Sequence, residues 1–264
     1  MRAKHYPWLL LLSLLAVGCS GIRNRSNDDV FISIDDELML SEALVKRAAL
    51  RLPLIRDPEM GDFLNRIARD IGAVSDWNGL EYSVHVVDEA DVNHFSLPGG
   101  QIYLFRGLIQ ECERAGEVAA VIAHEIAHIS YRDGIERLAR KYGYAFAAQE
   151  LIGTNPEIPL QIVEQLYSEG TILDYPQAAE RRADAKAIEY LVKINFDPVC
   201  LIELLERFII LEDTRPDVMA LLRSTHARAM HRLHRVRKTV ARTRRPENLL
   251  RDLEIFEHVK SKIQ

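Results

Sequence analysis

Residues 118–129 read VAAVIAHEIAHI, and most of the fold and chemistry can be predicted outward from this stretch. Its apolar residues occupy nearly every position of the helical turn, so it predicts a helix that is buried all round. His124 and His128 are four residues apart, so both imidazoles project from one face and can bind the same metal ion. Glu125 stands beside them, where its carboxylate can reach a water molecule at that ion. The alternative is two core histidines with Glu125 as an internal ion partner, an arrangement that would need costly compensation inside a buried helix.

A catalytic zinc ion needs three protein ligands and an open position, and a later helical stretch offers the third ligand. In residues 178–193, which read AAERRADAKAIEYLVK, Glu180 and Asp184 align with the apolar stripe instead of the charged one. Carboxylates on a buried face require a cation or hydrogen-bond donors. We therefore predict that Glu180 ligates the zinc and that Asp184, one turn later, holds a ligand histidine. The alternative is a pair of ion pairs with Arg181 or Arg182.

The remaining patterns predict a predominantly helical α+β fold with a small sheet near its start. Of the 264 residues, 48% are hydrophobic and 28% are charged, which excludes a disordered chain. Alternation and β-branched residues predict strands at 80–87 and 101–105, joined through a turn at 98–100. Helices are predicted at 35–52, 58–71, 115–132, 134–151, 159–168, 176–194, 198–212, 227–242 and 247–262.

The first 19 residues, MRAKHYPWLLLLSLLAVGC, are typical of an export signal. A basic start precedes an apolar run that is too short to span a bilayer. The run ends in LAVGCS, which resembles a bacterial lipobox, so we expect cleavage before Cys19 and lipidation of its thiol. The predicted organisation is a signal peptide at 1–18, a lipid-anchored linker at 19–34 and a single metallopeptidase domain at 35–264. An ordinary signal peptide or a buried N-terminal helix are the alternatives.

Four blocks in this order and spacing resemble the gluzincin family of the CAAX prenyl protease type, metallopeptidase family forty-eight. They are NHFSLPGGQIYLFRGLI at 93–109, HEIAH at 124–128, ERRAD at 180–184 and STHARAMHRL at 224–233. The resemblance implies a zincin-like domain in which a small sheet packs on the HExxH helix, with Glu180 as the third zinc ligand. It also implies that His226 lies beside the zinc, stabilising the oxyanion or regulating access, and that Arg232 pairs with a buried carboxylate. A surface helix cap is the alternative for His226.

The sequence departs from the family pattern at four positions. Ala227 replaces the usual proline after the histidine, which leaves the placement of His226 open. His94 and Ser96 stand where alanine is frequent, and Asp133 stands where histidine often follows Arg132. The sequence assigns no role to His94, Ser96 or Asp133.

These features together predict a zinc endopeptidase, with one zinc ion per chain, that acts on unfolded or misassembled cell-envelope proteins. Glu125 would serve as general base and acid. The strand after the glycine turn would present an unpaired edge to an extended peptide, through Gly99, Gly100, Gln101, Ile102 and Tyr103. The expected location is the periplasm, at the outer membrane through the lipid anchor.

The alternative function is a zinc-stabilised periplasmic chaperone or adaptor for envelope assembly with latent protease activity, in which residues 143–175 cover the cleft. A purely structural lipoprotein is the third possibility. The 34 basic and 39 acidic residues argue against a nucleic-acid partner. Whether Cys112 and Cys200 form a disulfide is left open by the sequence.

Overall fold

The computed structural model describes residues 32–142, 157–168, 175–226 and 229–263. Ile32–Gln264 form one compact unit. The predicted signal peptide and linker up to residue 31, and most of the predicted cover at 143–175, lie outside the described residues. In the described part of the chain, no helix is both long enough and apolar enough to cross a bilayer.

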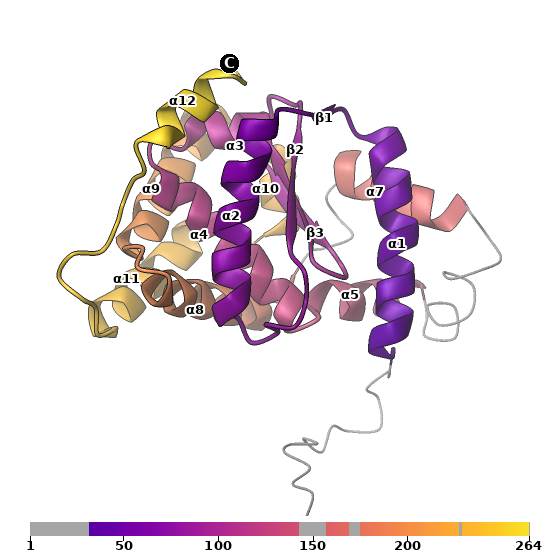
Figure 1. Cartoon of the computed structure of the whole chain (residues 1–264), viewed down its shortest axis with the longest axis horizontal. Helices are drawn as coiled ribbons and strands as arrows, with labels where there is room; N and C mark the ends of the chain where they lie inside the picture. Colours follow the sequence, from indigo (N-terminus) through magenta and orange to yellow (C-terminus); the bar gives the residue numbers. More distant parts are fainter. Residues whose placement is uncertain (1–31, 143–156, 169–174, 227–228, 264) are drawn as a thin grey trace, which may run out of the picture. The chain divides into compact units, whose positions relative to one another are not determined.

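Helices dominate the fold, and they surround a small mixed sheet (Figure 1). The described helices are α1 (Ile34–Arg51), α2 (Pro58–Val74), α3 (Arg106–Glu111), α4 (Ala115–Ser130), α5 (Asp133–Tyr142), α7 (Glu157–Ser168), α8 (Gln177–Lys193), α9 (Val199–Thr214), α10 (Ala220–Thr225), α11 (Ala229–Arg242) and α12 (Ile255–Ser261). The strands are β1 (Leu54–Ile55), β2 (Ser83–Val87), β3 (His94–Leu97) and β4 (Gln101–Phe105). The predicted α+β class with mostly helical content is confirmed.

Side-chain caps begin two of the early helices. Ser33 accepts a hydrogen bond from the Asp36 backbone N–H at 3.0 Å, and α1 follows. Asp57 does the same for the Met60 N–H at 2.8 Å, with Pro58 in the first turn of α2. These contacts satisfy donors that the first turn of a helix leaves without partners.

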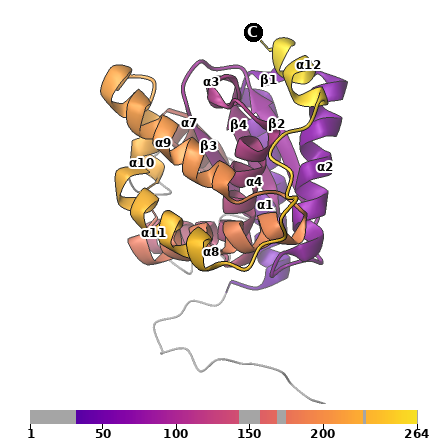
Figure 2. The same ribbon diagram turned by 90° about the vertical axis from the view of Figure 1, so that its left-hand side faces the viewer.

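Helix α4 lies at the centre of the fold. Every residue from Ala115 to Ile129 is buried, as its all-round apolar pattern predicts. Helix α2 lies on one side of α4 and α9 on another, as Figure 2 shows, and α4 also packs along α8 and against β3. The predicted packing of the sheet on the HExxH helix is therefore confirmed, and it occurs through β3.

The sheet has the strand order β1-β2-β4-β3, which corrects the predicted substrate edge. Strand β4 pairs in parallel with β2 and antiparallel with β3, so both of its sides are hydrogen-bonded. The prediction that Gly99, Gly100, Gln101, Ile102 and Tyr103 present an unpaired edge is wrong. The reason is that β3, which was not predicted, folds back through the turn at 98–100 and covers that side.

The two glycines of this turn have conformations that other residues rarely adopt, with φ of 76° at Gly99 and 94° at Gly100. A Cβ at Gly100 would also lie 2.2 Å from the backbone oxygen of Glu81. The turn therefore depends on glycine both for its angles and for its space.

One helix prediction differs from the structure, one extends beyond the described residues, and two helices were not predicted. The predicted helix at 247–262 is helical only in α12, because the backbone before it bonds elsewhere in the fold: Leu250 N–H donates to the Asn195 oxygen and the Leu250 oxygen accepts from Asp197 N–H. The predicted helix at 134–151 appears as α5, and its residues beyond 142 lie outside the described part. The short helices α3 and α10 were not predicted.

Candidate metal centre

Two histidines of α4 and one carboxylate of α8 converge at a single point. The Nε2 atoms of His124 and His128 lie 3.1 Å apart. A carboxylate oxygen of Glu180 lies 3.3 Å from the His128 Nε2, and its other oxygen lies 3.8 Å from the His124 Nε2. Spacing of four residues puts both imidazoles on one helix face, and packing of α8 on α4 brings the carboxylate to them.

The opposite nitrogen of each histidine faces an aspartate. His128 Nδ1 lies 2.8 Å from Asp133 Oδ2, and His124 Nδ1 lies 3.3 Å from Asp184 Oδ1. A carboxylate accepts only, so the contact with Asp133 assigns the proton of His128 to Nδ1. His124 Nδ1 lies 3.3 Å both from Asp184 and from Arg232 Nη2, which can only donate. With the proton of each ring on Nδ1, each Nε2 would turn a lone pair toward the other. Two lone pairs at 3.1 Å repel each other unless a cation or a proton lies between them.

This donor set fits a metal ion. Ligand atoms of a tetrahedral zinc ion lie about 3.3 Å from one another, close to the distances found among the three residues. One Glu180 oxygen is buried with no hydrogen-bond partner, although it has two lone pairs to donate. Together with His226, donor atoms of these residues all lie within 4.8 Å of one another. His124, His128 and Glu180 can hold the ion, as the sequence predicts.

In the metal-free centre, the pKa values of His124 and His128 are shifted in opposite directions. Burial and the Arg232 charge lower the pKa of His124 to about 4, although Asp184 opposes this. Burial also lowers the pKa of His128, but hydrogen bonds to Asp133 and Glu180 outweigh it and raise the pKa to about 9. A proton on His128 therefore takes the place of a cation between the two rings at neutral pH.

Glu125 lies on α4 next to the metal-binding face and is fully buried. Its Oε1 lies 2.8 Å from His94 Nδ1 and 3.6 Å from His226 Nε2, whereas its Oε2 has no hydrogen-bond partner. Burial raises the pKa of Glu125, but the hydrogen bond with His94 and the nearby histidines outweigh it and hold the pKa below its ordinary value. The carboxylate is therefore ionised, with one oxygen free to accept a proton.

His226 follows α10 at its C-cap position and is nonetheless buried, with 5% of its surface exposed. Its Nδ1 lies 3.0 Å from Glu180 Oε1. It is thus a helix cap, but not one on the surface. Ala227 lies outside the described residues.

Arg232 of α11 pairs with a buried carboxylate, as the resemblance implied, and that carboxylate is Asp184. Its Nη2 donates to Asp184 Oδ1 at 2.7 Å, and its Nη1 lies 3.7 Å from Glu180 Oε2. Burial raises the pKa of Asp184, but the charge of Arg232 and the contact with His124 outweigh it and lower the pKa to about 2. The alternative ion pairs of Glu180 are not formed, since Arg182 contacts Asp133 instead.

Three residues at the centre were missed by the sequence reasoning. His94 of β3 contacts Glu125, Asp133 contacts His128, and the Tyr175 ring stacks on His128 with centroids 4.0 Å apart. For His94 and Asp133 the available signal was their departure from the family pattern described above, in which alanine and histidine are frequent at these two positions. Arg132 adopts a left-handed φ of 58°, so the chain turns sharply between α4 and α5. This turn brings Asp133, the first residue of α5, back to His128 of α4.

The centre is closed in this structure. His124, Glu125, His128 and Glu180 each expose 1% of their surface or less. The edge strand β3 is buried along its whole length. A polypeptide can reach the ligands only after neighbouring parts of the chain move.

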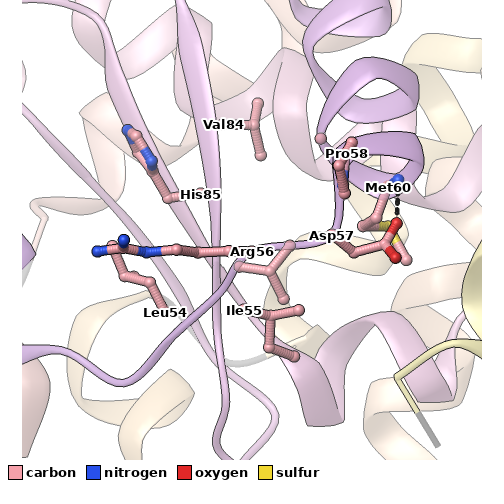
Figure 3. Close-up of a pocket in the computed structure, with 10 residues that line it drawn as sticks. Leu54, Ile55, Arg56, Asp57, Pro58, Met60, Val84 and His85 are labelled. Atoms are coloured by element: carbon pink, nitrogen blue, oxygen red, sulfur yellow. Dashed lines mark hydrogen bonds between the residues drawn. The ribbon is translucent and has the colours of Figure 1, made fainter.

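A pocket of about 360 Å³ lies elsewhere, between β1, β2 and the start of α2 (Figure 3). Two of its polar side chains are engaged within the fold: Asp57 caps α2, and His85 lies 2.9 Å from the Gln101 side chain. The pocket contains none of the residues of the metal centre. Cys112 and Cys200 are also outside the centre, and both are buried and free.

Comparison with known proteins places the centre within a recognised sequence family. The sequence model of Peptidase family M48 matches residues 55–240, which include every residue of the centre named above. The chain is 26% identical over 219 residues to mitochondrial metalloendopeptidase OMA1 of Schizosaccharomyces pombe, a match covering 81% of this chain and 63% of the relative.

Two bacterial relatives are named for beta-barrel assembly. The chain is 26% identical over 176 residues to the putative beta-barrel assembly-enhancing protease of Vibrio cholerae, covering 63% of this chain and 36% of the relative. It is 24% identical over 187 residues to the beta-barrel assembly-enhancing protease of Yersinia pestis, covering 67% and 38%. The chain thus spans less than two thirds of the length of each of these relatives.

Proposed function

The chain belongs to peptidase family M48, and from this premise we propose that it is a zinc-dependent endopeptidase for unfolded or misassembled proteins of the cell envelope. The observation that carries the proposal is the combination of a three-residue donor set with a buried, ionised carboxylate beside it. His124, His128 and Glu180 would hold the ion, and Glu125 lies beside them with one oxygen that has no hydrogen-bond partner.

The proposed roles follow from these positions. A bound zinc ion supplies a Lewis acid that polarises a carbonyl group and lowers the pKa of water. Glu125 accepts the proton of the attacking water on its free oxygen and delivers it to the leaving amine. His226, 3.6 Å from Glu125, stabilises the oxyanion or regulates access. Asp184 and Asp133 hold the ligand imidazoles in the tautomer that leaves Nε2 free.

The proposed substrate is an extended polypeptide that pairs with β3 instead of β4. Strand β3 is the sheet edge that packs on α4, and it carries His94 into the centre. Backbone pairing along a strand recognises extended chains with little regard for sequence, which suits unfolded proteins better than prenylated ones. The buried state of β3 means that pairing requires an opening movement.

The proposed location rests on the first 19 residues and on the bacterial relatives. We propose that residues 1–18 are a signal peptide, that Cys19 carries a lipid and that residues 35–264 work in the periplasm at the outer membrane. The relatives from Vibrio cholerae and Yersinia pestis are named as beta-barrel assembly-enhancing proteases, which supports an envelope substrate. Labelling with a radioactive fatty acid tests the anchor, and equal labelling of Cys19→Ser would refute it.

The decisive experiment compares Glu125→Gln with the wild type on unfolded casein. Because the carboxamide cannot accept a proton, we expect cleavage to fall by about 10²–10⁴-fold while bound zinc stays at one ion per chain. Glu117→Gln is the matched control, since Glu117 is buried on the same helix but pairs with Arg207, away from the centre. Unchanged cleavage in Glu125→Gln would refute the proposed base.

The second candidate function is a zinc-stabilised periplasmic chaperone or adaptor with latent protease activity. The observation that favours it is the closure of the centre, whose ligands are all at most 1% exposed. Incubating both Glu125→Gln and wild type with unfolded casein separates the two functions. Equal binding by both, with no chelator-sensitive cutting by either, would favour the adaptor.

A further inference from the structure

The two nitrogens of His226 face two different carboxylates. Its Nδ1 lies 3.0 Å from Glu180 Oε1, on the side of the predicted zinc ligands. Its Nε2 lies 3.6 Å from Glu125 Oε1, on the opposite side of the ring. His226 therefore separates the ligand cluster of His124, His128 and Glu180 from a second group of donors.

That second group consists of His94, Glu125 and His226. One donor atom from each lies within 4.8 Å of the other two, and all three residues are buried. The Glu125 Oε1 lies 2.8 Å from His94 Nδ1 and 3.6 Å from His226 Nε2, on either side of the roughly 3.3 Å expected between ligand atoms of one zinc ion. The other Glu125 oxygen has no hydrogen-bond partner.

The composition of the group matches the ligands that zinc-class ions take in proteins, two imidazoles and a carboxylate. His226 is the residue that this group shares with the group of His124, His128 and Glu180. Its Nε2 faces Glu125 and its Nδ1 faces Glu180, so each group can use a different nitrogen of the ring. Two ions can therefore be held without competing for a ligand atom.

We propose that His94, Glu125 and His226 form a second metal site, which binds an additional zinc-class ion and thereby inhibits the peptidase. The proposal rests on the function proposed above, because inhibition follows only if Glu125 is the base. An ion on Glu125 Oε1 draws negative charge from the carboxylate, so its other oxygen accepts the proton of the attacking water less readily. Zinc would then activate at one equivalent and inhibit at two.

The test measures ion binding and cleavage separately, with free zinc set by a metal buffer. Equilibrium dialysis of the wild type should give two zinc ions per chain, and casein cleavage should rise with the first and fall with the second. His94→Ala and His94→Asn should each bind one ion. Asparagine keeps a hydrogen-bond donor for Glu125, so this variant covers the case in which alanine prevents folding.

In either variant the zinc concentration that halves the maximal rate should rise by at least about tenfold. The control is His258→Ala, which removes an exposed histidine of α12 and should retain both ions and the inhibition. Each rate is compared with the maximum of the same variant, so a change in maximal activity does not affect the result.

Three outcomes would overturn the proposal: a wild type that binds a single ion, a second ion that both His94 variants retain, or a rate that rises as the second ion binds. Failure of the proposed function has a different signature, in which the first ion is not bound or supports no cleavage. Because dialysis needs no substrate, the ion count tests the second site in either case.

Discussion

Removing the guanidinium of Arg232 tests how the fold supports the metal centre. Arg232 exposes 4% of its surface and Asp184 is buried beside it, with three hydrogen bonds between them at 2.7, 3.2 and 3.2 Å. Arg232→Met keeps most of the volume of this buried side chain but leaves the Asp184 carboxylate as a buried charge without its cationic partner. We expect this single change to lower the free energy of unfolding by about 3–5 kcal/mol.

The pKa of Asp184 sets the size of the coupling between the two residues. Its lowering from an ordinary 3.8 to about 2 corresponds to about 2 kcal/mol of stability in the ionised state. Because the folded pKa is below the unfolded one, this contribution is present above about pH 4 and is lost as the pH falls toward 2. In Arg232→Met/Asp184→Asn neither member of the pair carries a charge. The stability lost in the double variant should therefore be about 2 kcal/mol less than the sum of the two single losses.

The assay is urea denaturation of the four proteins at pH 7 with excess chelator, so that bound metal does not contribute to stability. Repeating it at pH 3 should shrink the difference between wild type and Asp184→Asn. Losses that add within 0.5 kcal/mol, or a loss below about 1 kcal/mol for Arg232→Met, would refute the assignment of this pair as a buried, charge-compensating contact.

Three further predictions concern the ligand support, the titration of the centre and the packing. Asp133→Asn should weaken zinc binding by about 10–100-fold in chelator competition, because His128 loses the carboxylate that fixes its tautomer; unchanged affinity would contradict this. Because the pKa of His128 is raised to about 9 in the metal-free fold, protonated His128 contributes to the free energy of unfolding below pH 6.5, and this contribution is lost as the pH rises to 9. The denaturation midpoints of His128→Gln and wild type should therefore converge between pH 6.5 and 9. Gly107→Ala should destabilise the fold by about 1–3 kcal/mol, because its Cβ would lie 2.0 Å from the Ala90 oxygen. Gly61→Ala in α2, where no atom lies within 4 Å of the added Cβ, should stabilise the fold by about 0.5–1 kcal/mol. Equal denaturation midpoints for the two variants would refute the packing argument.

Local patterns were sufficient to predict the ligand helix and its partner. The four-residue spacing of His124 and His128 determines that both rings share a helix face, whatever surrounds the helix. The position of Glu180 and Asp184 on the apolar stripe of α8 likewise predicts that both are buried, and both are. These features depend on helical periodicity and on the cost of burying charge, and both can be evaluated from neighbouring residues alone.

The edge of the sheet could not be predicted in this way. Whether β4 is internal depends on β3 pairing with it, and the four residues of β3 are too few to show a pattern. Residues 247–254 show the same limit, since their helical pattern was outweighed by backbone bonds from Leu250 to Asn195 and Asp197.

The sequence by itself predicted the ligand set proposed for the metal centre, because periodicity and charge burial act within one helix at a time. Only the tertiary structure decided what surrounds those ligands. His94 meets Glu125 across 31 positions of sequence and His226 meets Glu180 across 46, and such contacts exist only once β3, α8 and α10 have packed around α4. The direction of a side chain toward a distant partner is a property of that packing, since no short-range preference specifies it.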